Sequence, residues 1–513
     1  MYLYRFIPKC KCCGVVSHIK RYSTTIKNHE VISDLLGLSP RDALYFVTKE
    51  KLKQKDTQQL VQSIRYCQSL GFSNDDLLTN PTLLRQHFVA LEHHYLSMME
   101  GGFTNIDAAV LGRAVHYMKR EIITLKRLSL IPFETDVAES FVNHIDNKEI
   151  ATKIYESYPD DTPWNIVHMN MLKLFLKWRL RATDDDLVTL FRVHKMIKYK
   201  SFKIIQENIA IAEELGYDNE KILKNGYVLN NYPKYARTIL EDFSNIAGLD
   251  MKNAVKVHPK LLMISPNNII RIYGILKEFG VHDEAIRKYP QIFTMSPETI
   301  KTRLQIIDGN NNVKFLLKHP QLLKLILYHK RTKKRLSFIQ ELQLKCASIT
   351  VLGTTGDAAF EKYIREGKDI NHPGDVVFFV NNLFKTQDPS LKNRLMKHPY
   401  YLQVPLYKMA ETYNFLVHRK FHPTNIYKVV HIILYPRNKI KNIIDSMTKE
   451  DIHDVDYKSL SQTEKLNILI YLMEKEHHFT GNGVWSNETT DTEAPLEIPE
   501  ETYLPDSAEQ PKM

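Results

Sequence analysis

The sequence predicts an all-α protein built as a curved helical-repeat solenoid, in which helix pairs of about 30 residues are joined by short proline-led turns. Apolar segments led by proline recur at Pro259, Pro290 and Pro320, which are almost evenly spaced. The residues after the first two prolines show the apolar spacing of an amphipathic helix. A unit of this size buries its apolar face only by stacking on its neighbours, and such stacking is typical of solenoids.

Each unit is expected to contain a short helix, a proline-led segment, a longer helix and a glycine. In the first copy, Ile269, Ile272 and Leu276 give the longer helix its apolar face. Proline is well tolerated in the first turn of a helix, so it marks a helix start. Gly280 follows that helix, where a left-handed residue is favoured. The glycines at positions 216, 248 and 280 recur at equal intervals, slightly longer than those between the prolines.

Composition and repeat pattern divide the chain into five parts. They are a targeting peptide (1–25), an N-terminal helical region with degenerate repeats (26–204), the repeat solenoid (205–445), a C-terminal helical cap (446–484) and an acidic disordered tail (485–513). Individual helices are expected near 106–128, 134–157, 164–180, 358–366 and 375–386. The tail holds eight acidic residues and one lysine from residue 488 onward, which is typical of disorder.

The segment 1–29 carries six Lys or Arg and no acid, as mitochondrial presequences do. A disordered basic tail is the alternative. Cys10, Cys12 and Cys13 lie in this segment without a partnering pair at zinc-site spacing. The chain has no apolar run long enough to span a membrane.

Catalytic and cofactor motifs are absent from the sequence. It has no phosphate-binding loop, no dinucleotide fingerprint, no nucleophile elbow and no metal-ligand spacing. Asp184, Asp185 and Asp186 follow Thr183, which is the pattern of a capped helix start rather than of a metal site. We therefore expect no enzyme activity, no catalytic residue, no metal and no cofactor.

Basic residues are concentrated in three segments. Residues 313–345 hold nine Lys or Arg and one acid, residues 385–441 hold eleven and two, and residues 171–203 hold nine and three. Solvated helix faces would explain any one of these segments. Three of them on one solenoid favour a polyanionic partner such as nucleic acid.

The third repeat differs from the first two. When the repeats are aligned by their prolines, Lys330 falls where the earlier copies have Ile269 and Ile300, and Lys333 falls where the first has Ile272. This alignment predicts that charge replaces core residues in this helix, so that it cannot pack as its predecessors do.

The repeated pattern resembles the mitochondrial transcription termination factor (mTERF) family. The segments that carry the resemblance beyond the three repeats are Arg394-Leu395-Met396-Lys397-His398-Pro399, Val404-Pro405-Leu406, Phe421-His422-Pro423-Thr424-Asn425-Ile426 and Ile433-Leu434-Tyr435-Pro436-Arg437. They are similar to the last repeats of metazoan members. The resemblance covers residues 205–445 well and residues 60–200 loosely.

The resemblance implies a crescent of helical repeats that lies along double-stranded mitochondrial DNA and regulates transcription termination or polymerase passage. Some family members instead bind ribosomal RNA during mitochondrial ribosome assembly, and that is the alternative function. The resemblance and the basic segments together give candidate nucleic-acid contacts. Candidates for reading bases are Arg303, Arg335, Arg394, Arg419 and Arg437, and candidates for phosphate contacts are Lys330, Lys333, Lys334, Lys392 and Lys397. Arg331, in the same basic cluster, is a further candidate nucleic-acid contact.

The expected location is the mitochondrial matrix, at the nucleoid, and the expected partner is mitochondrial double-stranded DNA. Further partners considered are mitochondrial rRNA, the transcription machinery and another mTERF-family protein. A protein-binding scaffold, in which the charge only keeps the chain soluble, is the third hypothesis. We expect that replacing Lys333, Lys334 and Arg335 by glutamate abolishes most nucleic-acid binding and leaves the fold intact.

Overall fold

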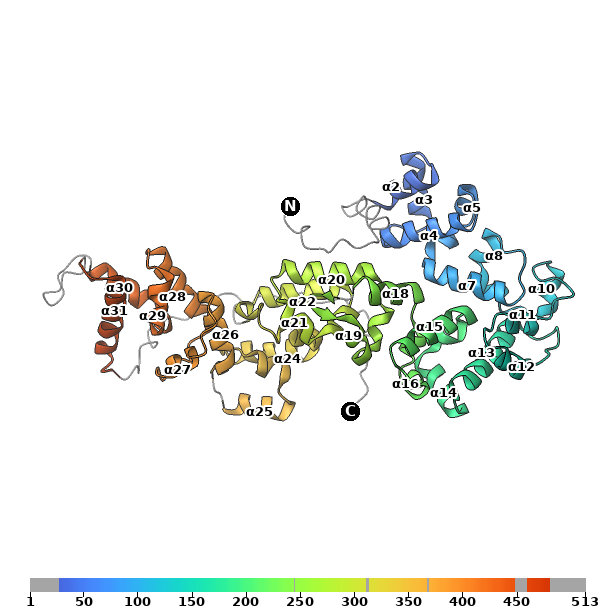
Figure 1. Cartoon of the computed structure of the whole chain (residues 1–513). Helices are drawn as coiled ribbons and strands as arrows, with labels where there is room; N and C mark the ends of the chain where they lie inside the picture. The colour runs from blue at the N-terminus through green and yellow to red at the C-terminus, as the bar shows by residue number, and fades with distance from the viewer. Residues whose placement is uncertain (1–26, 244, 311–312, 367–368, 448–458, 480–513) are drawn as a thin grey trace. The chain divides into compact units, whose positions relative to one another are not determined.

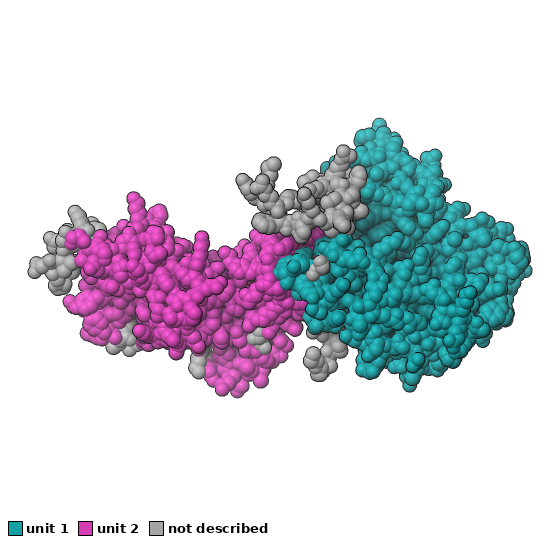
Figure 2. All heavy atoms as spheres, in the orientation of Figure 1, with its two compact units in different colours: residues 1–266 teal, residues 267–513 magenta. Residues whose placement is uncertain are grey.

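A computed structural model describes residues 27–243, 245–310, 313–366, 369–447 and 459–479. They belong to two compact units, residues 1–266 and residues 267–513, which Figure 2 draws in different colours. The regular structure of the described residues is helical apart from one antiparallel pair of strands, β1 (Asn245–Ile246) and β2 (Leu249–Asp250). The all-α helical-repeat class is therefore confirmed. The predicted targeting peptide and acidic tail lie outside the described residues.

Figure 1 shows the helices of the first unit following one another along the chain. They are α2 (Asn28–Leu36), α3 (Pro40–Lys49), α4 (Thr57–Ser69), α5 (Asn74–Thr79), α6 (Thr82–Arg85), α7 (Phe88–Glu100), α8 (Ala108–Gly112), α9 (Ala114–Tyr117), α10 (Ile122–Arg127), α11 (Val137–Asn143), α12 (Lys148–Ile154), α13 (Trp164–Leu180), α14 (Asp184–Val193), η2 (Lys195–Tyr199), α15 (Phe202–Glu214), α16 (Asn219–Lys224), α17 (Tyr227–Asn230), α18 (Pro233–Glu241), α19 (Met251–Val257) and η3 (Pro259–Met263).

The second unit continues the same alternation of long and short helices. It contains α20 (Pro266–Glu278), α21 (Asp283–Lys288), η4 (Pro290–Thr294), α22 (Pro297–Asp308), η5 (Lys314–Leu316), α23 (Leu322–Leu327), α24 (His329–Glu341), η6 (Thr350–Thr354), α25 (Asp357–Glu366), α26 (Pro373–Phe384), α27 (Leu391–Leu395), α28 (Leu406–His418), α29 (Pro423–Lys428), η7 (Val430–Leu434), α30 (Arg437–Met447) and α31 (Gln462–Glu476).

One repeat consists of a short α-helix, a proline-led 3₁₀ segment and a long α-helix, as α21, η4 and α22 show. Pro297 is the first residue of α22, where its missing N–H costs nothing. The Ser296 hydroxyl caps the helix by accepting a hydrogen bond from the Thr299 amide at 3.1 Å. Gly280 ends α20 with φ +71°, a left-handed conformation that glycine adopts without strain. The predicted order of elements is therefore confirmed in these repeats.

Several long helices carry a buried polar residue at their seventh position. Its side chain donates a hydrogen bond to a backbone oxygen that lies two or three residues before the next long helix begins. The pairs are Asn208 with Asn231 (3.2 Å), Arg303 with Ile326 (3.0 Å) and Thr412 with Tyr435 (2.9 Å), each with a sequence separation of 23. We call these contacts the junction hydrogen bonds.

The junction hydrogen bonds provide donors for backbone oxygens that have no hydrogen-bond partner within their own helix. The last carbonyl groups of a helix have no partner in the helix itself, and burying them unpaired is costly. A donor in the preceding long helix supplies that partner and ties consecutive repeats together. The side-chain oxygen or nitrogen atoms that make these bonds are buried, so they are set apart from water and from any external ligand.

Two predicted helices are interrupted. The region 106–128 forms α8, α9 and α10, and 134–157 forms α11 and α12. The chain leaves the helix before α10 because Glu121 pairs with Pro163 in a β-bridge and Arg120 O accepts a hydrogen bond from the Trp164 amide at 2.9 Å. These contacts come from a distant segment, so the local sequence could not reveal them. The predicted helices near 164–180, 358–366 and 375–386 are confirmed as α13, α25 and α26.

Candidate nucleic-acid interface

Helix α24 carries the densest group of exposed cations among the predicted site residues. Its buried face contains His329, Thr332, Arg335, Leu336 and Ile339. The three lysines of the helix, Lys330, Lys333 and Lys334, are exposed. With 3.6 residues per turn, they lie on the side of α24 opposite its buried face. We call the side formed by these three lysines the α24 basic face.

The predicted replacement of core residues by charge is wrong. The buried Thr332, Leu336 and Ile339 of α24 repeat the spacing of the buried Ile300, Leu304 and Ile307 of α22, so Thr332 corresponds to Ile300. The proline spacing had instead matched Lys330 with Ile300, which placed the lysines in the core. The segment after Pro320 forms the α-helix α23, whereas the earlier copies form 3₁₀ turns, and this change shifts the register by two residues.

Arg335 is part of the interior of the second unit. It is 2% exposed, and its guanidinium donates hydrogen bonds to the oxygens of Val351 and Thr355, both at 2.7 Å. It also pairs with Asp357 at 2.9 Å and lies 4.7 Å above the ring of Phe360. Arg335 therefore holds the π-helical turn η6 and the start of α25 against α24.

Arg303 occupies in α22 the position that Arg335 occupies in α24, one repeat later. It is 9% exposed, and its Nη1 donates the junction hydrogen bond to Ile326 O. Arg303 and Arg335, two of the five arginines predicted to read bases, are thus buried and donate hydrogen bonds to the backbone of their own chain. Arg331, by contrast, is exposed at the edge of α24, with its Nε 3.9 Å from Asp357 and its guanidinium 5.9 Å from the ring of Tyr328.

A second group of predicted residues surrounds α27. Lys392 and Lys397 are exposed, while Arg394 is half-buried and donates a hydrogen bond to Tyr427 O at 2.6 Å. Asp388 lies 3.6 Å from Arg394, and hydrogen bonds from Ser390 and Tyr427 lower the pKa of Asp388 to about 2. Arg394 is therefore held by a carboxylate that is charged at neutral pH. The two lysines have no such partner among the described residues.

The remaining two predicted residues lie nearer the C-terminal end. Arg419 follows α28, is exposed, and pairs with Asp445 at 2.9 Å. Arg437 is the exposed first residue of α30, and no ion pair to it is found among the described residues. The structure brings Lys330, Arg331, Lys333 and Lys334 together on α24, and Lys392, Arg394 and Lys397 together around α27.

One exposed lysine was missed by the sequence reasoning. Lys301 of α22 is exposed, and it has the position on α22 that Lys333 has on α24. The distance along the chain from Lys301 to Lys333 is one repeat length. That length could have been read from the interval between Gly216, Gly248 and Gly280 rather than from the prolines.

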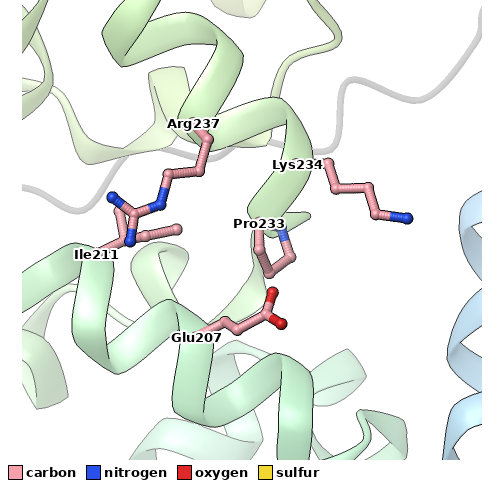
Figure 3. Close-up of a pocket in the computed structure, with 5 residues that line it drawn as sticks. All are labelled: Glu207, Ile211, Pro233, Lys234 and Arg237. Atoms are coloured by element: carbon pink, nitrogen blue, oxygen red, sulfur yellow. The ribbon is translucent and has the colours of Figure 1, made fainter.

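The pocket drawn in Figure 3 lies between α15 and α18 of the first unit and is lined by Glu207, Ile211, Pro233, Lys234 and Arg237. Lys234 and Arg237 point away from one another (Figure 3). Each is paired with a carboxylate, Lys234 with Glu92 at 2.7 Å and Arg237 with Glu214. The pocket therefore offers no free pair of cations to a phosphate group.

Neither a metal-binding cluster nor a membrane-spanning helix is found among the residues that the structure describes. No three His, Cys, Asp or Glu side chains there are grouped so that they could hold a metal ion. None of the helices formed by these residues is long and apolar enough to cross a membrane.

Comparisons with known proteins agree with the repeat pattern. The family model described as mTERF matches residues 148–361. The chain is 27% identical over 471 residues to a protein of Drosophila melanogaster named "Transcription termination factor 5, mitochondrial", and the alignment covers 90% of this chain and 84% of that relative. No solved structure matches the chain. The family resemblance predicted from the sequence is therefore confirmed.

Proposed function

We propose that this mTERF-family protein binds double-stranded DNA in mitochondria and regulates transcription there. The observation that carries the proposal is the α24 basic face. Its three lysines are exposed on a helix whose only acid, Glu341, is its last residue. A lysine-rich helix face attracts phosphates and gains affinity by releasing their counterions.

The α24 basic face is suited to positioning a nucleic acid rather than to reading its sequence. Lysine ammonium groups bind phosphates as point charges and carry no base information directly. The exposed residues Arg331 and Arg437 are the proposed candidates for base contacts, because a guanidinium can form two hydrogen bonds with guanine. For Arg303 and Arg335 we propose a structural role in place of base reading, since their donors bind the chain itself.

DNA is proposed over RNA because the Drosophila relative is named as a transcription termination factor. Ribosomal RNA offers the same phosphates, so the rRNA-binding reading is the second candidate function. The relative's name also supports a mitochondrial location, and the matrix nucleoid is where the proposed ligand would be found. A purely protein-binding scaffold would leave the lysines of the α24 basic face without a role in binding nucleic acid.

The test replaces Lys330, Lys333 and Lys334 by glutamine and measures binding to duplex DNA across a range of salt concentrations. We expect affinity to fall at least about tenfold near 0.1 M salt, and the slope of log affinity against log salt to decrease by up to about three. The matched control replaces the exposed Lys49, Lys53 and Lys119 of the first unit, which changes the net charge equally. Equal affinities of the two variants would contradict the proposal.

DNA and RNA are separated by a second measurement. The protein is crosslinked to nucleic acid inside isolated mitochondria, and the recovered sequences are determined. Recovery of discrete duplex-DNA sites supports the transcription proposal. Recovery dominated by ribosomal RNA would replace it by the ribosome-assembly function.

A further inference from the structure

Four long helices of the second unit end in the same kind of backbone turn. The amide that follows the turn donates a hydrogen bond to the carbonyl five residues back, as from Phe421 to Leu416 O at 3.0 Å. Within two residues of the end of α20, α24, α26 and α28, one residue has a positive φ. We call these the corner residues, and they are Gly280 (+71°), Gln343 (+54°), Lys385 (+54°) and Lys420 (+68°).

Two corner residues depart from glycine in the same way. Glycine adopts a positive φ without strain, whereas this conformation is uncommon for a residue that carries a Cβ atom. Lys385 and Lys420 nevertheless hold it, and both side chains are exposed. A cation in the last turn of the helix would complement the helix dipole without needing a positive φ. The dipole therefore does not account for lysine at these two corners.

The two corner lysines lie in consecutive repeats. Helix α26 contacts α28, and the long helices of consecutive repeats run in the same direction, so their C-terminal ends lie along one edge of the array. Packed helices are about 8–10 Å apart, and each lysine has a flexible four-carbon stem. The two ammonium groups can therefore reach neighbouring groups of one ligand. We call Lys385 and Lys420 the corner pair.

The acids near the corner pair are paired with other cations. Residues 385–441 hold eleven Lys or Arg and two acids. Asp388 lies 3.6 Å from Arg394, and Glu411 lies 3.5 Å from Lys408. No ion pair to either lysine of the corner pair is found among the described residues. The corner pair therefore offers two cations that no carboxylate of this segment neutralises.

We propose that the corner pair binds the phosphate backbone of the nucleic acid, as a second contact in addition to the α24 basic face. This inference rests on the proposed function. Phosphates recur along a strand and accept lysine ammonium groups as point charges, so two cations one repeat apart suit such a ligand. The residues that follow the two lysines, Thr386 and Phe421, are half-buried and buried. The corners thus offer charge without the exposed apolar side chain that insertion into a bilayer uses.

The test replaces both lysines of the corner pair by glycine in the full chain and measures affinity for duplex DNA across a range of salt concentrations. We expect affinity near 0.1 M salt to fall at least about fivefold, and the slope of log affinity against log salt to decrease by up to about two. Because glycine relieves the strain of a positive φ, the midpoint of urea unfolding is expected not to fall. Weaker binding without loss of stability is the result that a strained functional residue predicts.

Two controls separate the lost charge from the change of backbone. Gln343→Gly relieves the same strain in the same unit without removing a charge, and it is expected to leave affinity unchanged. Lys51→Gly removes an exposed cation that has φ +56° at the end of α3, and it is compared with the single variant Lys420→Gly. Lys51 is an isolated cation, because the helices before and after α3 end at Gly37 and Gly71. Its replacement is expected to leave affinity nearly unchanged.

Three outcomes would overturn the proposal. The first is a double glycine variant that binds duplex DNA as tightly as Gln343→Gly does. The second is wild-type affinity with asparagine at both positions, because asparagine tolerates a positive φ and is uncharged, so the loss with glycine would then come from backbone flexibility. The third is a loss of binding to vesicles of anionic phospholipid with duplex affinity unchanged, which would assign the corner pair to a membrane surface.

The failure of this proposal is distinguishable from the failure of the proposed function. If the wild type binds duplex DNA and the glutamine variant of the α24 basic face loses affinity while the corner variant keeps it, only the corner proposal fails. If the corner variant loses affinity while the α24 variant keeps it, the role of the α24 basic face fails and the corner pair stands. A wild type that binds no nucleic acid overturns both.

Discussion

The hydroxyl group of Thr412 donates a hydrogen bond to the backbone oxygen of Tyr435 over 2.9 Å, and both groups are buried. The same sequence separation of 23 joins Asn208 to Asn231 in the first unit. In both cases a polar side chain in the middle of a long helix donates a hydrogen bond to a backbone oxygen at the end of the next short segment. A reader of the sequence alone would take such a residue for an anomaly in the apolar face.

Replacing Thr412 by valine tests this role. Valine keeps the shape of the side chain but leaves Tyr435 O buried without its donor, which costs about 1–3 kcal/mol. The midpoint of urea unfolding is therefore expected to fall. The control is Thr302→Val on the exposed side of α22, which removes a hydroxyl group without uncovering a buried oxygen. Equal midpoints for the two variants would show that the junction hydrogen bond contributes nothing to stability.

Arg335→Met is expected to destabilise the second unit without directly removing a nucleic-acid contact. It deletes hydrogen bonds to Val351 O and Thr355 O and the ion pair with Asp357, and a loss of at least about 2 kcal/mol is expected. Lys333→Met, two residues earlier on the exposed face, is the control and should leave unfolding unchanged. The measurement is thermal or urea unfolding of both variants.

The structure therefore changes how charge reversal on α24 has to be interpreted. The sequence predicts that reversing Lys333, Lys334 and Arg335 together abolishes most binding and leaves the fold intact, but Arg335 is buried and paired inside the chain. A glutamate there would place a second carboxylate beside Asp357. Loss of binding by that triple variant would then report unfolding as well as lost contacts, and the triple glutamine variant at Lys330, Lys333 and Lys334 avoids this problem.

Glu100 gives the first unit a pH-dependent stability. It is 3% exposed, and its carboxylate accepts hydrogen bonds from the amides of Phe202 (2.7 Å) and Lys203 (2.9 Å). Burial raises the pKa of Glu100 to about 7, although these hydrogen bonds oppose the rise. The folded chain therefore holds this proton more tightly than the unfolded chain does. Its contribution to stability is fully present below pH 4.5 and is lost as pH rises towards 7.

Comparison with Glu100→Gln isolates this effect from other groups. Burial lowers the pKa of His168 to about 4, so that histidine acts in the opposite direction, and its contribution is lost as pH falls from 6.5 to 4. Glutamine does not titrate. Between pH 4.5 and 7 the wild type is therefore expected to lose up to about 3 kcal/mol of unfolding free energy relative to the variant. A difference that stays constant over this range would contradict the assignment.

Much of the repeat could be predicted from the sequence because its signals are local. Pro297 and Ser296 mark a helix start through their own chemistry, and Gly280 marks a helix end through its backbone freedom. The capped start of α14 at Thr183 was predicted for the same reason, and the structure shows a reciprocal capping box with Asp186.

The register of α24 could not be predicted from the prolines, because the segment after Pro320 folds differently from the segments after Pro259 and Pro290. Pro320 is followed by an α-helix rather than by a 3₁₀ turn, and this lengthens the unit by two residues. A polar residue on a buried face was equally hard to recognise. Nothing next to Arg303 in the sequence shows that its guanidinium donates a hydrogen bond to Ile326 O in the following repeat.

The candidate site was predicted in composition but not in arrangement. The concentration of lysine on residues 330–334 indicated a basic surface, and the structure shows three of these lysines on one exposed side of α24. Which arginines would be accessible depended on packing. The difference between Arg331, which is exposed, and Arg335, which is buried, is set by their places on the helix and by the contacts that η6 and α25 make with α24.

The seventh position of the long helices also bears on how the second unit would respond to mechanical tension. In α22 and α28 this position holds Arg303 and Thr412, and extension at either junction must break a buried hydrogen bond. In α20 the same position holds Ile272, whose aliphatic side chain has no donor to offer. A chain pulled from its two ends would therefore lengthen in unequal steps, with the repeat after α20 yielding at a lower force than the repeats after α22 and α28.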